Sequence, residues 1–217
     1  MLSIDTKKKE ELGNLTRNEA ITCAGEAIKV FDHDYSFLSE GRVIPHGIYD
    51  IRLNKGFLSL GNSHETATFV TDNLEWWWFT YGIHDYPDAS HVLIFCDCGG
   101  ANGYRHHLFK KLLQDLSRKT GLRITIVHYP PYCSKYNPIE RMLFSQVHRT
   151  IKNTILTDIQ QVKELMSKTH TSTGLTVIVR IVEKYYPTGV KSSKEDINPK
   201  RIFKHPVLPD FSYMISP

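Results

Sequence analysis

Hydrophobic and polar positions along the chain predict antiparallel strands first, followed by helices and strands in alternation. Short apolar runs bounded by turn residues predict strands over residues 1–5, 27–31, 47–51, 56–60, 91–97, 122–127 and 175–182. Apolar residues at helical spacing predict helices over residues 64–81, 104–119, 138–153 and 160–169. Gly121 stands where a glycine commonly ends a helix, which supports the boundary of the second of these helices.

The order of these elements indicates the fold class. Three antiparallel strands followed by helix, strand, helix, strand and helix is the order of an α/β ribonuclease H-like fold, although other mixed α/β folds could accommodate it. We therefore expect a mixed sheet, antiparallel over strands 1–3 and then parallel, flanked by helices. Residues 1–155 are predicted to form the core, and residues 156–217 a helical and extended extension packing on it. Within that extension, the proline-rich and basic residues 191–217 predict an extended arm.

Composition adds few constraints, but the charge distribution is uneven. The chain has 217 residues, 41% of them hydrophobic and 23% charged, as in an ordinary soluble globular protein. No apolar stretch approaches the roughly 20 residues of a membrane span, and no targeting peptide is apparent, so a cytoplasmic protein without membrane partners is expected. Residues 1–100 hold 8 Lys/Arg and 15 Asp/Glu, whereas residues 101–217 hold 19 and 8. The basic half fits a surface that meets a phosphate backbone, and equally a solvated basic tail.

Two acidic residues stand at positions that favour metal chemistry. Asp97 ends an apolar strand and is followed by glycines, and Glu140 lies near the start of a later helix. Carboxylates that meet at one edge of a sheet bind hard divalent metals, which can move phosphoryl groups. Other roles remain open, because Asp97 could cap the glycine turn. With Asn137 as N-cap, Glu140 could complete a capping box.

The first acid of such a site is less evident. Asp5 ends the first predicted strand and becomes a candidate if that strand lies beside the one ending in Asp97. Asp50 is its rival, but it stands in the middle of a predicted hairpin strand and is expected to face solvent. Asp32 and Asp34 are weaker candidates, since acidic clusters are common in loops. The flanking cysteines Cys96 and Cys98 are expected to be structural, because they lack zinc-ligand partners at recognisable spacing.

Four separate blocks carry a resemblance to a known family. They are residues 5–10 (DTKKKE), 45–50 (PHGIYD), 97–103 (DCGGANG) and 134–140 (SKYNPIE). In this order they resemble the DDE transposase domain of the Rhodopirellula-type insertion-sequence family, over residues 3–217. Residues 61–66 (GNSHET) and 131–133 (PYC), together with Cys98, depart from the usual family pattern without removing a proposed ligand.

The resemblance implies a ribonuclease H-like fold, a catalytic and metal-binding triad, and a DNA partner. We assign the triad to Asp5, Asp97 and Glu140, holding two Mg²⁺ ions for which Mn²⁺ can substitute. It implies cleavage and strand transfer on double-stranded DNA, both transposon ends and target, and a possible homodimer. Such transposases also carry an N-terminal helix-turn-helix region that this sequence is expected to lack.

Basic residues near the predicted acids are candidates for contacts with phosphates. Lys135, Arg105 and Arg141 are the candidate DNA-binding residues, although each alone could be ordinary surface charge. Two other functions remain open: an inactive transposase remnant that binds DNA weakly, and a ribonuclease H-like nuclease acting on RNA or hybrids.

Overall fold

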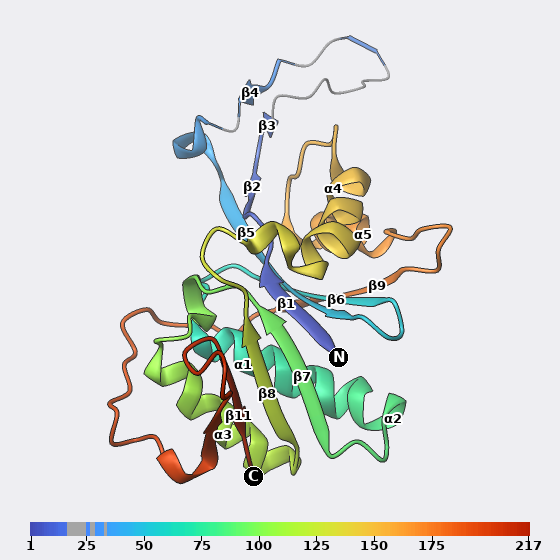
Figure 1. Cartoon of the computed structure of the whole chain (residues 1–217). Helices are drawn as coiled ribbons and strands as arrows, with labels where there is room; N and C mark the ends of the chain where they lie inside the picture. The colour runs from blue at the N-terminus through green and yellow to red at the C-terminus, as the bar shows by residue number, and fades with distance from the viewer. Residues whose placement is uncertain (17–24, 27–28, 33) are drawn as a thin grey trace.

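A nine-stranded mixed sheet with helices on both faces organises the chain (Figure 1). The computed structural model describes residues 1–16, 25–26, 29–32 and 34–217. Within this part of the chain the strand order is β10-β11-β8-β7-β1-β5-β6-β9, and β2 also pairs with β5.

The centre of the sheet matches the predicted order of strands. β1 (Leu2–Thr6) lies between β5 (Gly41–Asp50), to which it is antiparallel, and β7 (His91–Cys96), to which it is parallel. β6 (Lys55–Gly61) is antiparallel to β5, and β8 (Arg123–His128) is parallel to β7. The predicted ribonuclease H-like mixed α/β fold is therefore confirmed.

Alternating side chains divide most of the interior into two large cores, one on each face of the sheet, beside a small third cluster that includes Phe69 and Tyr186. Phe57 of β6 joins the core that α1 (Ala67–Trp77) and α3 (His107–Thr120) cover, whereas its neighbour Leu58 joins the other core. The second core is covered by three elements: η5 (Glu140–Phe144), α4 (Ser145–Ile151) and α5 (Ile159–Ser167). Adjacent residues of a strand point to opposite faces, so one strand serves both cores.

The predicted helix over residues 64–81 is longer and less regular than its pattern indicates. After α1 the chain forms a wide turn, η2 (Trp78–Gly82), and then the short α2 (Ile83–Asp85). Trp77 and Trp78 are buried, and the partly exposed Trp76 lies under the guanidinium of Arg180, 3.9 Å from its ring centroid. The three consecutive tryptophans therefore serve packing.

Residues 156–217 supply strands at both edges of the sheet. β9 (Thr176–Val182) runs parallel to β6 at one edge. At the other edge β11 (Ser212–Ile215) pairs antiparallel with β8, and β10 (Ile202–Lys204), preceded by the turn η6 (Pro199–Arg201), pairs with β11. The C-terminal arm is thus extended as predicted, and its end is part of the sheet. A domain boundary at residue 155 stays a prediction.

Between β1 and β5 the described residues form an arm that projects from the sheet (Figure 1). It contains β2 (Glu10–Leu12), β3 (Leu15–Thr16), β4 (Phe31–Asp32) and the turn η1 (Ser36–Leu38). The predicted strand over residues 27–31 lies partly outside the described residues, because 27 and 28 are not among them; Phe31 begins β4. In the described part of the chain, no helix has both the length and the apolar character needed to cross a membrane.

Candidate active site

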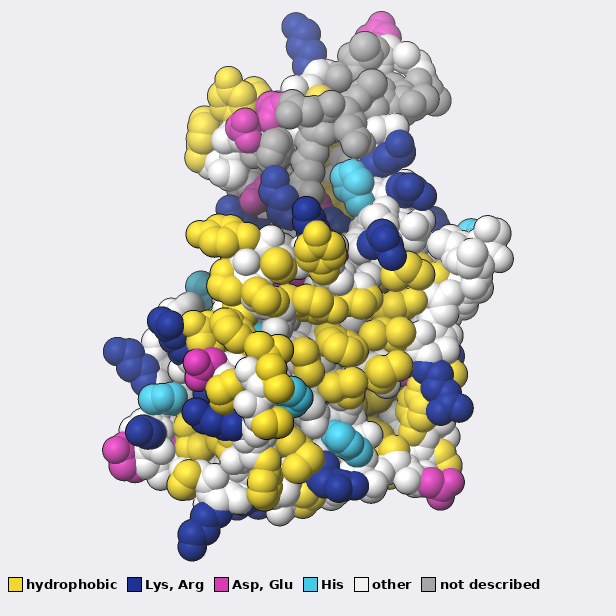
Figure 2. All heavy atoms as spheres, in the orientation of Figure 1, with side chains coloured by type: hydrophobic (Ala, Val, Ile, Leu, Met, Phe, Trp, Pro, Cys, Tyr) yellow, Lys and Arg dark blue, Asp and Glu magenta, His cyan; other side chains and the backbone are white. Residues whose placement is uncertain are grey.

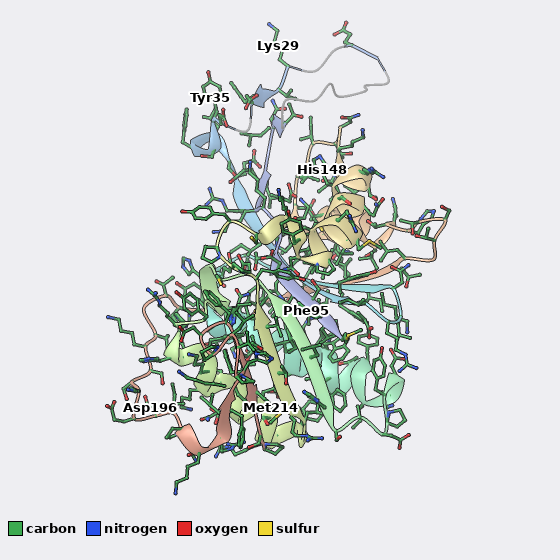
Figure 3. The ribbon with its side chains drawn as sticks, viewed as in Figure 1. Lys29, Tyr35, Phe95, His148, Asp196 and Met214 are labelled. Atoms are coloured by element: carbon green, nitrogen blue, oxygen red, sulfur yellow. The ribbon has the colours of Figure 1, made fainter. Side chains whose placement is uncertain are left out.

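Parallel pairing of β1 and β7 sets Asp5 level with Asp97. Leu2 pairs with Ile94, and Ser3 pairs with Phe95, which is labelled in Figure 3. Continuing that register by two residues puts Asp5 beside Asp97, the first residue after β7. The carboxyl ends of parallel strands share one edge of the sheet, and ligands commonly bind there. The structure thus brings together the first two predicted acids.

A tight turn follows Asp97 and holds its carboxylate. The Asn102 amide donates to Asp97 Oδ1 at 3.3 Å, and the Gly99 backbone N–H donates to the same carboxylate. Gly100 has φ of +60° and begins the turn η3 (Gly100–Asn102). Asp97 therefore does accept from the glycine turn, as one interpretation of the sequence proposed, and its position beside Asp5 is compatible with metal binding.

Asn137 has a different role from the predicted N-cap. Its side chain is fully buried, donates through Nδ2 to the backbone oxygen of Ile4 at 3.1 Å, and accepts from the Ser3 hydroxyl through Oδ1. The Ser3 hydroxyl in turn accepts from the backbone N–H of Ile139 at 3.0 Å. A residue of β1 thus caps the helix, and Asn137 ties the helix start to the strand that carries Asp5.

Two glycines let this helix lie close against the sheet. A Cβ on Gly47, the register partner of Asp5, would come 2.6 Å from a ring carbon of Phe144. A Cβ on Gly56 would come 2.4 Å from a methyl carbon of Leu143. Side chains at these positions of β5 and β6 would push η5 away. The glycines therefore help to bring Glu140 to the acid edge.

The three carboxyl groups influence one another electrostatically. Burial, followed by the negative charges of Asp97, Glu140 and Glu65, raises the pKa of Asp5 to about 8. Burial raises the pKa of Glu140, although a side-chain hydrogen bond with Asp5 and the charge of Lys7 oppose that effect. Burial also raises the pKa of Asp97, although hydrogen bonds from Gly99 and Asn102 oppose that effect. The cluster therefore binds protons that a metal cation would displace.

Glu65 is a fourth acid at this edge, and the sequence analysis missed it. Burial raises its pKa with a smaller contribution from Asp97, while the Thr6 hydroxyl donates a hydrogen bond to its carboxylate. A Cβ on Gly100 would come 3.1 Å from Glu65 Oε1. Glu65 directly precedes Thr66, the N-cap of α1, so its local sequence context indicates only a helix start. Glu65 follows β6, which runs parallel to β1 because both are antiparallel to β5. A residue that follows β6 is therefore expected at the same edge of the sheet as Asp5, and this position is the signal that could have revealed Glu65.

The chemistry of these side chains fits divalent metal ions, although they are not arranged as a finished cage. In the parts of the chain that the structure describes, no three His, Cys, Asp or Glu side chains are already placed as ligands of one ion. Carboxylate oxygens are nonetheless the ligands that Mg²⁺ prefers, and this cluster carries an excess of negative charge. The Lys7 ammonium lowers the pKa of Glu140, and its ion pair is with Glu10.

Other predicted candidates lie away from this cluster. Asp50 does not face solvent, contrary to the expectation for a hairpin strand: it is 1% exposed, pairs with Leu2 at the opposite end of β1 from Asp5, and accepts from the Tyr86 hydroxyl at 2.8 Å.

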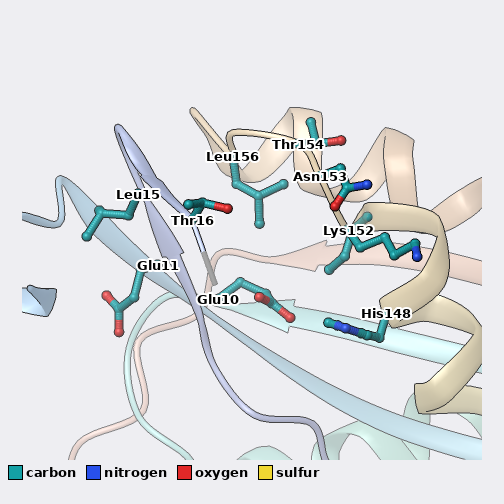
Figure 4. A pocket seen from close by; sticks show the side chains of 10 residues that line it. Glu10, Glu11, Leu15, Thr16, His148, Lys152, Asn153, Thr154 and Leu156 are labelled. Atoms are coloured by element: carbon teal, nitrogen blue, oxygen red, sulfur yellow. The ribbon is translucent and has the colours of Figure 1, made fainter. Parts of the chain in front are cut away.

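A hollow between the arm and the end of α4 is lined by Glu10, Glu11 and His148 (Figure 4). Glu11 pairs with Arg42 at 2.7 Å, so these acids stabilise the base of the arm.

The predicted DNA-binding residues flank the acid edge. Lys135 is exposed on η4 (Ser134–Tyr136), in the loop before Glu140, and Arg141 is exposed on η5. Arg105 is exposed in the loop after Asp97 and lines a cavity with Lys110 and Lys204. Cys98 lies in the same region, where its thiol donates to the backbone oxygen of Tyr129 at 2.7 Å, in agreement with a structural role.

Together the sheet order and the acid cluster define a ribonuclease H-like domain of the DDE type. A scan against protein-family models matches residues 1–217 to the Rhodopirellula transposase DDE domain, so the chain belongs to this family and is a transposase domain of the catalytic type. The predicted resemblance is therefore confirmed, and the family implies DNA as a partner. Searches of curated proteins and of solved structures found no match.

Proposed function

We propose that this domain cleaves DNA phosphodiester bonds and transfers the freed strand, with Asp5, Asp97 and Glu140 holding two divalent ions. One observation carries the proposal: three acids far apart in the sequence meet at the carboxyl edge of β1 and β7, close enough for Asp97 and Glu140 to raise the pKa of Asp5. A protein keeps a cluster of partly buried acids only if a compensating interaction offsets their repulsion. Divalent cations provide that compensation.

Bound Mg²⁺ or Mn²⁺ would supply positive charge for the attacking and leaving oxygens of an in-line displacement. The side chains of this domain favour the binding of that positive charge in two ways. Burial and the neighbouring acids raise the pKa of Asp5, so a bound cation would favour the release of its proton. The bonds that join Asn137 to Ser3 and Ile4 keep Glu140 at a fixed position relative to Asp5.

Basic side chains on the Asp97 side of the site support a path for the DNA backbone. The cavity beside Arg105 is also lined by His107, Lys110, Lys204 and the single acid Asp210. Burial and the neighbouring Lys204 lower the pKa of Lys110, which a bound phosphate would oppose. Replacing Lys110 and Lys204 with Gln should therefore weaken DNA binding uniformly across sequences and reduce its salt dependence.

The test is nicking of supercoiled plasmid by the purified chain in Mg²⁺ and in Mn²⁺. Asp97→Asn and Glu140→Gln should each reduce the rate by about 10³-fold, because each removes a charged metal ligand. Glu164→Gln, on the exposed face of α5, is the matched control and should nick like wild type. Cleavage that persists in EDTA or in both site variants would contradict the proposal. An RNA–DNA hybrid in a parallel reaction tests the ribonuclease alternative.

A homodimer is the assembly we propose for the domain. Its support is an aromatic cluster on the arm, where Phe31, Tyr35 and Phe37 are each at least half exposed and adjacent ring centroids lie 6.3 and 5.9 Å apart. Figure 2 shows hydrophobic side chains gathered over this part of the arm, at the upper left. Exposed apolar clusters of this kind mark interaction surfaces. Light scattering should give the mass of a dimer for wild type and of a monomer for Phe37→Ser; a monomeric wild type would contradict the proposal.

A further inference from the structure

One aromatic side chain in the loop before Glu140 is entirely in solvent. Tyr132 is 101% exposed, so its ring buries nothing against the described part of the chain. Its backbone has φ of +65°, in the left-handed region. A bulky residue rarely adopts this conformation, which costs about 1–2 kcal/mol in a residue with a Cβ. Tyr132 thus strains the fold without contributing packing in return.

The strain comes from a tight turn. The backbone N–H of Cys133 donates to the oxygen of Pro130 at 3.1 Å, so Pro131 and Tyr132 are the two central residues of the turn. Proline suits the first central position, and a positive φ at the second favours glycine or asparagine. Glycine or asparagine in place of Tyr132 would form this turn with less backbone strain. The tyrosine side chain is therefore not explained by folding, and strain of this kind points to function.

Both ends of this loop are fixed to the acid edge of the sheet (Figure 1). At its start, the backbone N–H of Tyr129 donates to the oxygen of Cys96 at 2.9 Å, one residue before Asp97. At its end, Asn137 is bonded to Ile4, one residue before Asp5. The loop that contains Tyr132 is consequently attached at its two ends to the two strands that carry Asp97 and Asp5.

The same loop carries a second aromatic residue and a cation. Tyr136 is 63% exposed, and the Lys135 ammonium lies 5.2 Å from the centroid of its ring. Exposed aromatic rings with neighbouring cations are the chemistry that binds unstacked bases and the attached phosphates. A duplex with all its bases stacked offers such a ring no free base face. The expected ligand is therefore a base that has left the stack.

We propose that Tyr132 stacks on an unpaired DNA base next to the phosphate that the acid cluster cleaves. The inference rests on the proposed function, because it takes the acid edge as the site of cleavage. Stacking tolerates any base, so Tyr132 selects unpaired over paired DNA and does not select sequence. Stacking of the Tyr132 ring on a base would compensate for the backbone strain, and this compensation would occur only in the DNA complex.

The test uses three replacements at one position: Tyr132→Phe, Tyr132→Ala and Tyr132→Gly. Binding is measured by anisotropy in EDTA, with one duplex fully paired and another carrying 2-aminopurine in a short unpaired stretch. Wild type and Tyr132→Phe should bind the unpaired DNA equally and quench the 2-aminopurine fluorescence. Tyr132→Ala and Tyr132→Gly should bind it about 5- to 100-fold more weakly, with little change on paired DNA.

Thermal melting separates this role from a structural one. Tyr132→Gly relieves the strain and should raise the melting temperature by a few degrees, even as it weakens binding to unpaired DNA. A residue with only a structural role would not move these two readouts in opposite directions. Phe79→Ala, which removes a partly exposed ring of η2, is the control and should leave the preference for unpaired DNA unchanged.

Two results would overturn the inference in distinguishable ways. If wild type nicks plasmid and Tyr132→Gly keeps wild-type affinity for unpaired DNA, the stacking role is wrong and the proposed function stands. If wild type neither binds nor nicks DNA, while its melting curve reports a folded protein, both are wrong.

Discussion

Asp5 and Asp50 lie on neighbouring antiparallel strands and have opposite environments. Asp50, fully buried, accepts hydrogen bonds from the Tyr86 hydroxyl and from the backbone N–H groups of Arg52 and Leu53 at 3.0 and 3.2 Å. Asp5, partly buried, accepts from the Thr6 N–H at 2.7 Å and otherwise meets other acids. The partners of a carboxylate, more than its burial, thus distinguish a structural aspartate from a candidate catalytic one.

The largest expected difference between Asp5 and Asp50 is the effect on nicking when each carboxylate is replaced by a neutral amide. Asp5→Asn should reduce metal-dependent nicking by about 10³-fold, because it removes a proposed ligand, while the protein stays folded. Asp50→Asn should keep nicking within a few fold of wild type, since the carboxylate lies at the other end of β1. Plasmid nicking, with circular dichroism as the check on folding, measures both. Equal losses in the two variants would contradict the distinction.

Removing the side chains entirely should affect stability in the reverse order. Asp50→Ala leaves the Tyr86 hydroxyl and two backbone N–H groups without their acceptor, so the free energy of unfolding should fall by about 3 kcal/mol. Asp5→Ala relieves repulsion among acids and should leave the free energy of unfolding unchanged or raise it at neutral pH in the absence of metal. Urea denaturation in EDTA measures both values. A larger loss for Asp5→Ala would show that Asp5 is the structural residue.

The hydrogen bonds between Asn137 and β1 provide a further test of how the environment of Asp5 is built. Asn137→Ala removes buried hydrogen bonds to Ser3 and Ile4 and should cost about 2 kcal/mol. Because the same bonds fix Glu140 relative to Asp5, nicking should also fall, and more at low Mn²⁺ concentration than at saturation. Asn62→Ala, at an exposed position, is the control and should alter neither property. A stability loss without any change in the dependence on Mn²⁺ would limit Asn137 to a structural role.

The smallest expected effect is the change in the free energy of unfolding for each pH unit. The pKa of Asp5 is raised to about 8 from 3.8, so the folded state holds a proton that the unfolded state releases above about pH 4. This stabilisation is complete below that pH and is lost as the pH rises through about 8. In EDTA, the stability of wild type should therefore fall between pH 5 and 8, by at most about 1.4 kcal/mol per pH unit. Asp5→Asn should give a flatter profile, and identical slopes would contradict the account.

Local sequence signals predicted much of the fold and indicated two acids of the proposed triad. The periodicity of apolar residues predicted the order of strands and helices, and the end of an apolar strand identified Asp97. Glu140 followed from the start of a helix. These features are set by residues close in sequence, which is why a single sequence carries them.

Other features depend on pairing between distant segments. Asp5 could be preferred to Asp50 from sequence only if β1 lay beside β7, and that pairing joins Leu2 to Ile94. Asn137 has the composition of an N-cap, yet its partners are on β1, more than 130 residues earlier. Neither Glu65 nor the pairing of β11 with β8 leaves a local pattern, because each is determined by how strands are ordered in the sheet.

The central claim is that folding brings Asp5, Asp97 and Glu140 together as ligands of divalent metal. A crystal soaked in Mn²⁺ tests it directly through anomalous scattering. We expect Mn²⁺ peaks within about 2.0–2.3 Å of oxygens from all three carboxylates, and their loss in Asp5→Asn crystals. An ordered site without Mn²⁺, or Mn²⁺ bound by other acids with Asp5 still hydrogen-bonded to Glu140, would contradict the account.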